Sequence, residues 1–226
     1  MQDTSIIKKL VAEALGSAFL LAVVVGSGIM AERLAGGNVA LALLANALAT
    51  GAGLIALILM FGAISGAHFN PVVSLSASLQ KQMPWGQTVQ FVLAQIVGAI
   101  LGVAIAHVMF ELPFFFASTH SRTGIAQWFS EFIATFGLLA VIISTSKSRP
   151  AVTPFAVAAY IVSAYWFTSS TSFANPAVTI ARAMSNTFAG IHPADVLGFI
   201  LAQILGALAA TLVFGWLYQD TDNKGT

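Results

Sequence analysis

The sequence predicts an all-α membrane protein with six transmembrane helices and two re-entrant half-helices, arranged as an inverted repeat. Three observations predict it: a strongly apolar composition, six apolar runs of bilayer length, and an Asn-Pro segment in each half. Of the 226 residues, 58% are hydrophobic and 8% are charged, whereas a soluble domain carries about 25% charged residues. The chain therefore lacks the polar surface that a water-soluble protein needs.

A helix needs roughly 18 to 20 apolar residues to cross the hydrocarbon core of a bilayer. The first apolar run follows Lys8 and Lys9 as in a signal peptide, but it contains Glu13 and is too long for the apolar region of such a peptide. We therefore interpret it as a retained span within a single domain, residues 1–226. The six predicted spans, of which the fifth is the shortest, are Leu10–Met30, Val39–Ile64, Val89–Phe110, Ile125–Thr145, Ala151–Thr168 and Ala194–Tyr218.

The chain contains two similar halves, about residues 1–115 and 120–226. The segment "AEALGSAFLLAVV" from Ala12 resembles "SEFIATFGLLAVI" from Ser130, and "FVLAQIVGAILG" from Phe91 resembles "FILAQILGALAA" from Phe199. Each half has three spans, and an odd number makes the second half enter the membrane from the opposite side. The two halves are then related by a two-fold axis in the membrane plane.

An Asn-Pro pair in each half is followed by an apolar segment too short to cross the membrane, Pro71–Leu79 after Asn70 and Pro176–Ala183 after Asn175. Asparagine favours the N-cap of a helix and proline its first position, so each pair predicts the start of a half-helix. Symmetry makes the two N-termini face each other, and each asparagine keeps amide N–H donors for a solute oxygen. The loops before them are expected to line a central pore, with Gly66, Ala67, His68, Thr171 and Phe173.

These features resemble the aquaporin or major intrinsic protein family over essentially the whole chain. The resemblance rests on the two Asn-Pro boxes, a glutamate repeated in spans one and four, and a glutamine repeated in spans three and six. It implies six tilted helices around two half-helices, a pore in every protomer, and a homotetramer. The first box has Val72 where the family usually has alanine, which implies a packing change between the half-helices. With "NPAVTIAR" in the second box, the chain resembles the bacterial aquaglyceroporin-like branch associated with arsenic resistance.

The family resemblance also carries over a selectivity filter. An arginine usually follows the second box directly; here Val178 holds that position, and Arg182, one helical turn further on, is interpreted as a structural or vestibule arginine. Offsets from the two asparagines assign the other three positions. The expected filter is small, without an aromatic ring or a charge, and consists of Thr50, Ser163, Ser172 and Val178. Such an opening suits hydroxylated solutes larger than water.

Two glutamates lie within apolar spans, where a carboxylate is costly and needs partners. They either carry protons or accept hydrogen bonds from backbone N–H groups of the re-entrant loops. The family uses them in the second way, so the resemblance implies loop bracing by the glutamates and the two repeated glutamines: Glu13, Glu131, Gln95 and Gln203. For His68, a pore-facing and a buried structural position are both open.

We expect a passive channel for water and small uncharged solutes, extending to polyols, metalloid hydroxides such as arsenous acid, and other arsenicals. One alternative is an ordinary glycerol and water facilitator, and another is a proton-coupled secondary transporter that uses Glu13 or Glu131. A structural junction protein would leave the open filter without purpose. We find no nucleophile–base pair and no metal-ligand cluster, so we expect no enzyme activity, cofactor or metal.

The remaining composition bears on partners and location. Cysteine is absent, which excludes disulfides, and the net charge of +1 indicates no nucleic-acid partner. The expected partners are small neutral solutes, water and the lipid bilayer. The positive-inside rule predicts a multi-pass protein of the cell inner (plasma) membrane with both termini in the cytoplasm. It sets six basic residues on the cytoplasmic side against three on the other, namely Lys8, Lys9, Lys81, Lys147, Arg149 and Lys224 against Arg33, Arg122 and Arg182.

Overall fold

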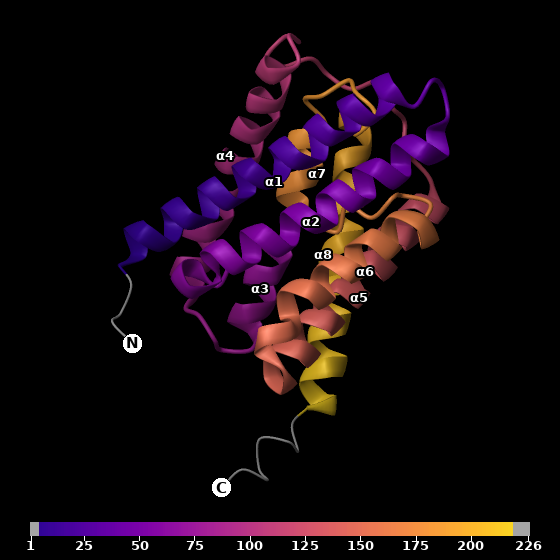
Figure 1. Cartoon of the computed structure of the whole chain (residues 1–226). Coiled ribbons are helices and arrows are strands. Elements are labelled where there is room, and N and C mark those ends of the chain that lie inside the picture. The colour runs from indigo at the N-terminus through magenta and orange to yellow at the C-terminus, as the bar shows by residue number, and fades with distance from the viewer. Residues whose placement is uncertain (1–4, 219–226) are drawn as a thin grey trace, which may run out of the picture.

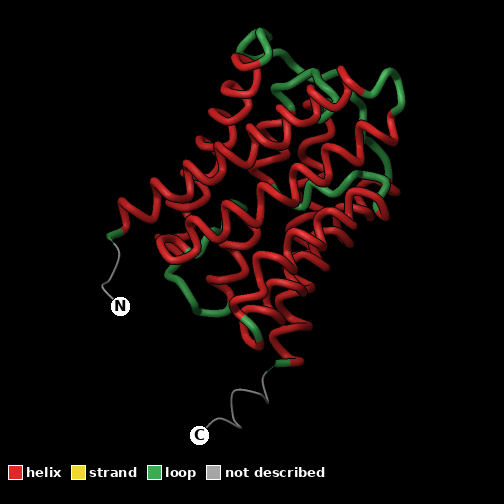
Figure 2. Tube along the Cα trace, viewed as in Figure 1, coloured by secondary structure: helices red, strands yellow, loops and turns green. Residues whose placement is uncertain are grey.

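The computed structural model describes residues 5–218, and the regular elements over this range are helices (Figures 1 and 2). Six helical segments are long and apolar enough to cross a membrane, which confirms the predicted fold class. The elements in chain order are α1 (Ile6–Leu34), α2 (Val39–Ser65), α3 (Pro71–Leu79), α4 (Trp85–Met109), α5 (Ile125–Ser148), η1 (Pro150–Val152), α6 (Thr153–Phe167), α7 (Pro176–Arg182), η2 (Pro193–Asp195) and α8 (Val196–Leu217).

The spanning helices agree with the predicted apolar runs to within four residues at each end. The largest differences, four residues, are at both ends of α1, which runs from Ile6 to Leu34, and at the start of α4, Trp85. The reason is that backbone hydrogen bonding continues through polar residues at the membrane surface, such as Lys8 and Glu32, whereas the apolar pattern stops before them.

The two short helices α3 and α7 begin at the asparagines, which cap them. The Asn70 side-chain oxygen accepts a hydrogen bond from the backbone N–H of Val72, and that of Asn175 accepts from Ala177 and Val178. A proline follows each cap, as its fixed φ favours. Nine and seven residues rise only about 13 and 10 Å, so neither helix spans a hydrocarbon core of about 30 Å.

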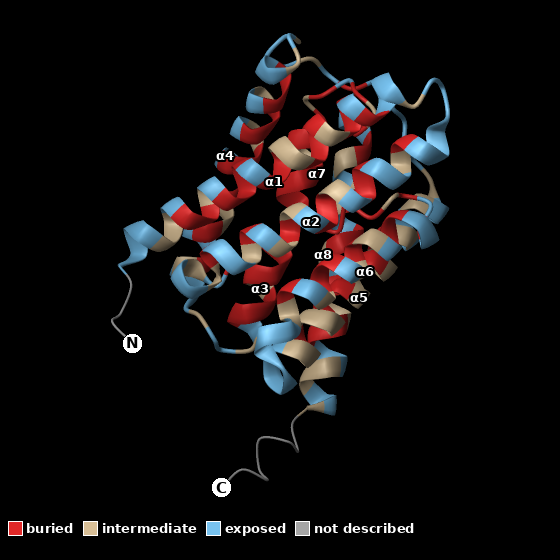
Figure 3. Cartoon of the chain, in the orientation of Figure 1, coloured by how far each residue is buried: buried red, intermediate tan, exposed pale blue. Residues whose placement is uncertain are grey.

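The long helices enclose α3 and α7, which carry most of their residues buried (Figure 3). In the first half α1 packs against α2 and α4, and in the second half α5 packs against α6 and α8. In each half, a glycine allows one of these helix pairs to approach closely. A Cβ at Gly98 on α4 would collide with the Ala14 carbonyl of α1, and a Cβ at Gly206 on α8 would collide with the Phe132 carbonyl of α5.

Six spans bring the start of α1 and the end of α8 to the same face of the membrane, here called the terminal side (Figure 1). The chain is thus a multi-pass membrane protein, and the exposed outer positions of its helices are largely leucine, valine and phenylalanine. Of the basic residues used to predict orientation, Lys224 lies outside the described residues.

Candidate pore

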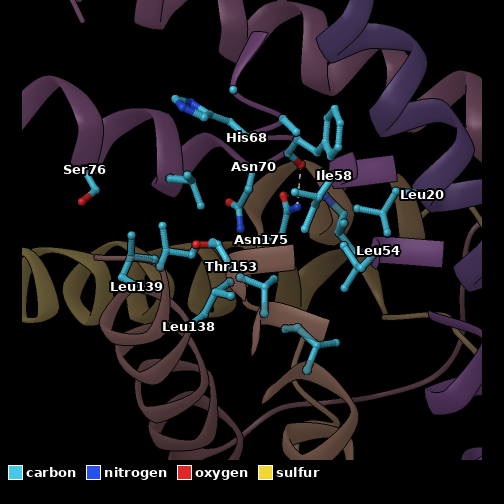
Figure 4. A pocket seen from close by; sticks show the side chains of 18 of the residues that line it. Leu20, Leu54, Ile58, His68, Asn70, Ser76, Leu138, Leu139, Thr153 and Asn175 are labelled. Carbon is cyan, nitrogen blue, oxygen red and sulfur yellow. Dashed lines mark hydrogen bonds between the residues drawn. The ribbon is translucent and has the colours of Figure 1, made fainter. Parts of the chain in front are cut away.

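A cavity of about 260 Å³ is lined by residues of both half-helices, including the two asparagines. Residues of α1, α2, α5, α6, α3, α7 and the two re-entrant loops line it, whereas α4 and α8 do not reach it. Liquid water occupies about 30 Å³ per molecule, so the cavity has room for several waters or one small polyol. Much of its wall is apolar, and Figure 4 shows Leu20 and Leu54 on one side and Leu138 and Leu139 on another.

Asn70 and Asn175 lie side by side on this cavity (Figure 4). The side-chain nitrogen of Asn70 donates to the carbonyl of Ala174, and that of Asn175 donates to the carbonyl of Phe69, each at 2.8 Å. An amide carries two N–H groups, so each asparagine keeps one donor beyond this cross-link. The two half-helices are thereby tied together while one N–H of each asparagine stays available to a solute.

The two re-entrant loops have matching backbone conformations. In the first, Ala67 and Phe69 have φ values of 52° and 48°, and in the second Ser172 and Ala174 have 51° and 47°. Non-glycine residues in this left-handed region are uncommon and each costs about 1–3 kcal/mol. Of the predicted loop residues, four line the cavity and Thr171 does not; the four are Gly66, Ala67, His68 and Phe173.

Glu13 holds the first re-entrant loop through hydrogen bonds to its backbone. Its carboxylate is fully buried and accepts hydrogen bonds from the backbone N–H of His68 at 3.0 Å and of Phe69 at 2.7 Å. The Gln95 side-chain nitrogen donates to the same carboxylate at 2.8 Å and to the hydroxyl of Ser74 at 3.0 Å. His68 lines the cavity while its Nδ1 is 3.0 Å from the same hydroxyl, so it combines the two positions that the sequence left open.

Glu131 supports the second loop through the equivalent contacts. It accepts hydrogen bonds from the backbone N–H of Phe173 at 2.9 Å and of Ala174 at 2.8 Å. The Gln203 side-chain nitrogen donates to this carboxylate at 2.6 Å and to the hydroxyl of Thr179 at 2.9 Å. The four residues interpreted as loop braces thus make the hydrogen bonds that this role requires.

Three of the four expected filter residues line the cavity: Thr50, Ser172 and Val178. Ser163 does not, and its placement in the filter was wrong. It lies on the exposed side of α6, where its hydroxyl donates to the Tyr160 carbonyl at 3.1 Å. Counting back from Asn175 failed because the count crosses the irregular loop between α6 and α7, where one residue more or less rotates the helix register by 100°.

The α6 residue at the level of Thr50 is Tyr165. Its hydroxyl lies 3.3 Å from the Thr50 hydroxyl, and it lines the cavity with Ile161, one turn earlier. The expectation of a filter without an aromatic ring is therefore corrected. Helical spacing alone shows that Ile161 and Tyr165 share a face of α6, but not that this face is the inner one.

Arg182 also lines the cavity, as a vestibule arginine would, and adds a charged side chain to the wall that the expected filter lacked. Its side chain is 2% exposed, and its guanidinium carbon lies 3.4 Å from the ring centroid of Phe173. Its Nε–H donates to the Ala189 carbonyl. The sequence motif did not indicate this position, because the family arginine stands one helical turn earlier.

Arg122, in the loop between α4 and α5, makes contacts with two other loops that the sequence did not predict. Its guanidinium donates to the carbonyls of Gly190 at 2.8 Å and Ser170 at 3.1 Å, and lies 5.1 Å from the Phe173 ring. Burial lowers the pKa of Arg122, and the charge of Glu131 opposes this shift. Arg122 thereby joins three loops on the side opposite the terminal side.

Within residues 5–218, no group of three His, Cys, Asp or Glu side chains could hold a metal.

Comparisons with known proteins agree with this architecture. A family model described as major intrinsic protein matches residues 1–172. Aquaglyceroporin AqpS of Rhizobium meliloti (strain 1021) is 50% identical over 97% of this chain and 94% of its own length. Nodulin-26 of Glycine max is 29% identical over 92% of this chain and 77% of its own length. The X-ray structure of the aquaglyceroporin from Plasmodium falciparum superposes with a TM-score of 0.67 and 21% identity, covering 95% of this chain and 96% of that chain.

Proposed function

The chain belongs to the major intrinsic protein family, and on this premise we propose that it conducts small hydroxylated solutes, including polyols and arsenous acid, beside water. As a member of that family it is a passive channel for water and small solutes and not an enzyme. The observation that carries the proposal is the cavity lined by both asparagines, each of which keeps one amide N–H free. These donors and the hydroxyl of Thr50 suit a solute with several oxygens.

The side chains at the expected filter positions that line the cavity favour passage of solutes larger than water. Val178 replaces the long side chain expected at its position, and Thr50 and Ser172 are small. Ser172 is 3% exposed, and its buried hydroxyl has no hydrogen-bond partner among the described residues. Metalloid hydroxides share these features with glycerol: they are neutral, compact and bear several hydroxyls. We extend the proposal to other arsenicals on the same grounds.

The half-helices supply a barrier to cations. Each helix N-terminus acts as about half a positive charge. At about 4 Å and an effective dielectric constant near 20, one such end repels a monovalent cation by roughly 2 kcal/mol, and two by roughly 4 kcal/mol. This barrier acts on cations and does not hinder the uncharged solutes proposed here.

A second candidate is an ordinary glycerol and water facilitator. Tyr165 and Arg182 favour it, because a ring and a guanidinium at the end of the cavity narrow the range of solutes that fit. Proton-coupled transport is disfavoured by the contacts of the two buried glutamates. The Glu13 carboxylate accepts from four donors and that of Glu131 from three, so binding a proton would displace a hydrogen bond that holds a loop.

The test is stopped-flow light scattering on proteoliposomes, with water, glycerol, urea and arsenous acid compared in one preparation. The proposal predicts that glycerol and arsenous acid enter faster than into protein-free vesicles. Glycerol entry without arsenous acid entry supports the second candidate. Water entry alone contradicts both. We also propose that the protein is a homotetramer of the inner membrane with both termini in the cytoplasm. Protease accessibility of the two ends in oriented vesicles tests the orientation.

A further inference from the structure

Arg182 lies on the same face of α7 as Val178. The two are four residues apart, which on a helix aligns side chains one above the other. Long helical side chains lean towards the N-terminus of their helix, so the Arg182 side chain extends back over the turn that contains Val178. Both residues line the cavity.

The guanidinium of Arg182 is held on one side and open on the other. Phe173 lies against its face at 3.4 Å, and Nε–H donates to the Ala189 carbonyl. Within residues 5–218, nothing accepts a hydrogen bond from its two terminal nitrogens, and no carboxylate forms an ion pair with it. Four N–H donors and a positive charge without a direct ion-pair partner therefore remain beside the cavity.

Within residues 5–218, two carboxylates of the second half lie near this region, and both already accept hydrogen bonds. Asp195 accepts from the backbone N–H of Arg122 at 2.7 Å. The oxygens of Glu131 accept hydrogen bonds from the loop and from Gln203. Arg122 adds a second positive charge behind Phe173, at 5.1 Å from the ring. Of these charged residues, Arg182 lines the cavity, whereas Arg122, Glu131 and Asp195 do not.

We propose that Arg182 is the charge-selecting residue of this pore, supplying from one helical turn further on the guanidinium that the motif position lacks. It repels cations and donates hydrogen bonds to oxygens of passing solutes. The inference deepens the proposed function and rests on it. A unit charge about 4 Å from a monovalent cation, at an effective dielectric constant near 20, changes cation entry on the order of a thousandfold. Water in the cavity screens part of this, so we expect loss of the charge to raise cation leak about tenfold or more.

The first experiment compares potassium leak and glycerol flux in proteoliposomes containing wild type, Arg182→Gln, Arg182→Lys or Arg33→Gln. Arg33 is a matched control, since it also lies against a phenylalanine ring, Phe110, at 5.1 Å and donates to a backbone carbonyl, but on the exposed end of α1 away from the cavity. We expect raised leak in Arg182→Gln only, with leak kept low by the lysine. Equal leak in Arg182→Gln and wild type overturns the proposal.

The second experiment adds Val178→Arg to Arg182→Gln. If Arg182 does the work of a motif-position arginine, the double variant regains cation exclusion. A purely structural Arg182, which only stabilises the C-terminal end of α7, predicts lower thermal stability without a leak that Val178→Arg repairs; that result contradicts the proposal. Where Arg182→Gln does not reconstitute, Arg182→Met, which also removes the charge but keeps an apolar side chain against Phe173, replaces it in both leak comparisons; leak equal to wild type overturns the proposal. A wild type that conducts no neutral solute refutes the proposed function, whereas the leak measurements judge Arg182 separately.

Discussion

Asn70 and Asn175 are bound to one another's loops by a reciprocal pair of hydrogen bonds. Each side-chain N–H donates at 2.8 Å to the carbonyl of the residue directly before the other asparagine, Ala174 in one direction and Phe69 in the other. Each side-chain oxygen meanwhile caps its own half-helix. The same two side chains therefore fix where the half-helices begin and hold the two halves of the chain together at the middle of the cavity.

Replacing Asn175 by aspartate keeps the capping oxygen but turns the donor that meets the Phe69 carbonyl into an acceptor. We expect a loss of about 1–3 kcal/mol in stability, because two buried oxygens then face each other without a proton. Thermal unfolding in detergent measures it. Asn38→Asp is the control, since Asn38 caps α2 at an exposed position through its oxygen alone. Equal effects of the two substitutions would show that the cross-link contributes nothing.

Replacing Glu131 by glutamine should lower both stability and glycerol flux. One of its oxygens becomes an amide N–H₂ that faces donors from the loop or from Gln203, so at least one buried donor loses its acceptor, at about 1–3 kcal/mol. Glu32→Gln, on the exposed last turn of α1, should leave both unchanged. Coupled transport predicts a different result. In that case wild-type uptake depends on the proton gradient, and Glu131→Gln removes this dependence without lowering stability.

The α6 wall of the cavity can be tested by size selectivity. Tyr165→Ala removes a ring at the level of Thr50 and should raise the flux of a four-carbon polyol relative to glycerol, while Ser163→Ala should have no effect. Stopped-flow measurements with both polyols report the ratio. If Ser163→Ala changes the ratio and Tyr165→Ala does not, the sequence-based filter is right and the position of α6 described above is not.

The glycines at the crossings of the long helices should tolerate no side chain. Alanine at Gly98 or Gly206 would collide with a backbone carbonyl of the neighbouring helix, and overpacking of this kind costs about 1–3 kcal/mol or more. At Gly62 and Gly215 nothing lies within reach of an added Cβ, so alanine there should stabilise the helix by up to about 1 kcal/mol. Melting temperatures of the four purified variants provide the comparison.

The sequence predicted the features that depend on local rules. Apolar length located the six spans, and the Asn-Pro pairs located both half-helices to within one residue, because caps and proline act on the adjacent backbone. A carboxylate inside an apolar span needs partners, which left proton carriage and loop bracing both open for Glu13 and Glu131. The family resemblance then implied the loop-bracing role.

The sequence did not predict features that depend on how separate segments meet. The rotation of α6 depends on the conformation of the loop after it, so Ser163 was placed where Tyr165 lies. Arg182 lines the cavity because its side chain lies against Phe173 and extends back along α7. Counting residues from the Asn-Pro motif does not show the direction in which a side chain extends. Arg122 reaches Ser170 across 48 positions of the chain, and no pattern in one sequence indicates such a contact.

The most direct test of a passive channel for small uncharged solutes is glycerol influx into proteoliposomes as a function of concentration, with and without a protonophore. For a passive channel, we expect influx well above that of protein-free vesicles, proportional to the glycerol gradient and unchanged by the protonophore. Influx equal to that of empty vesicles, or influx that stops when the proton gradient is collapsed, would contradict it.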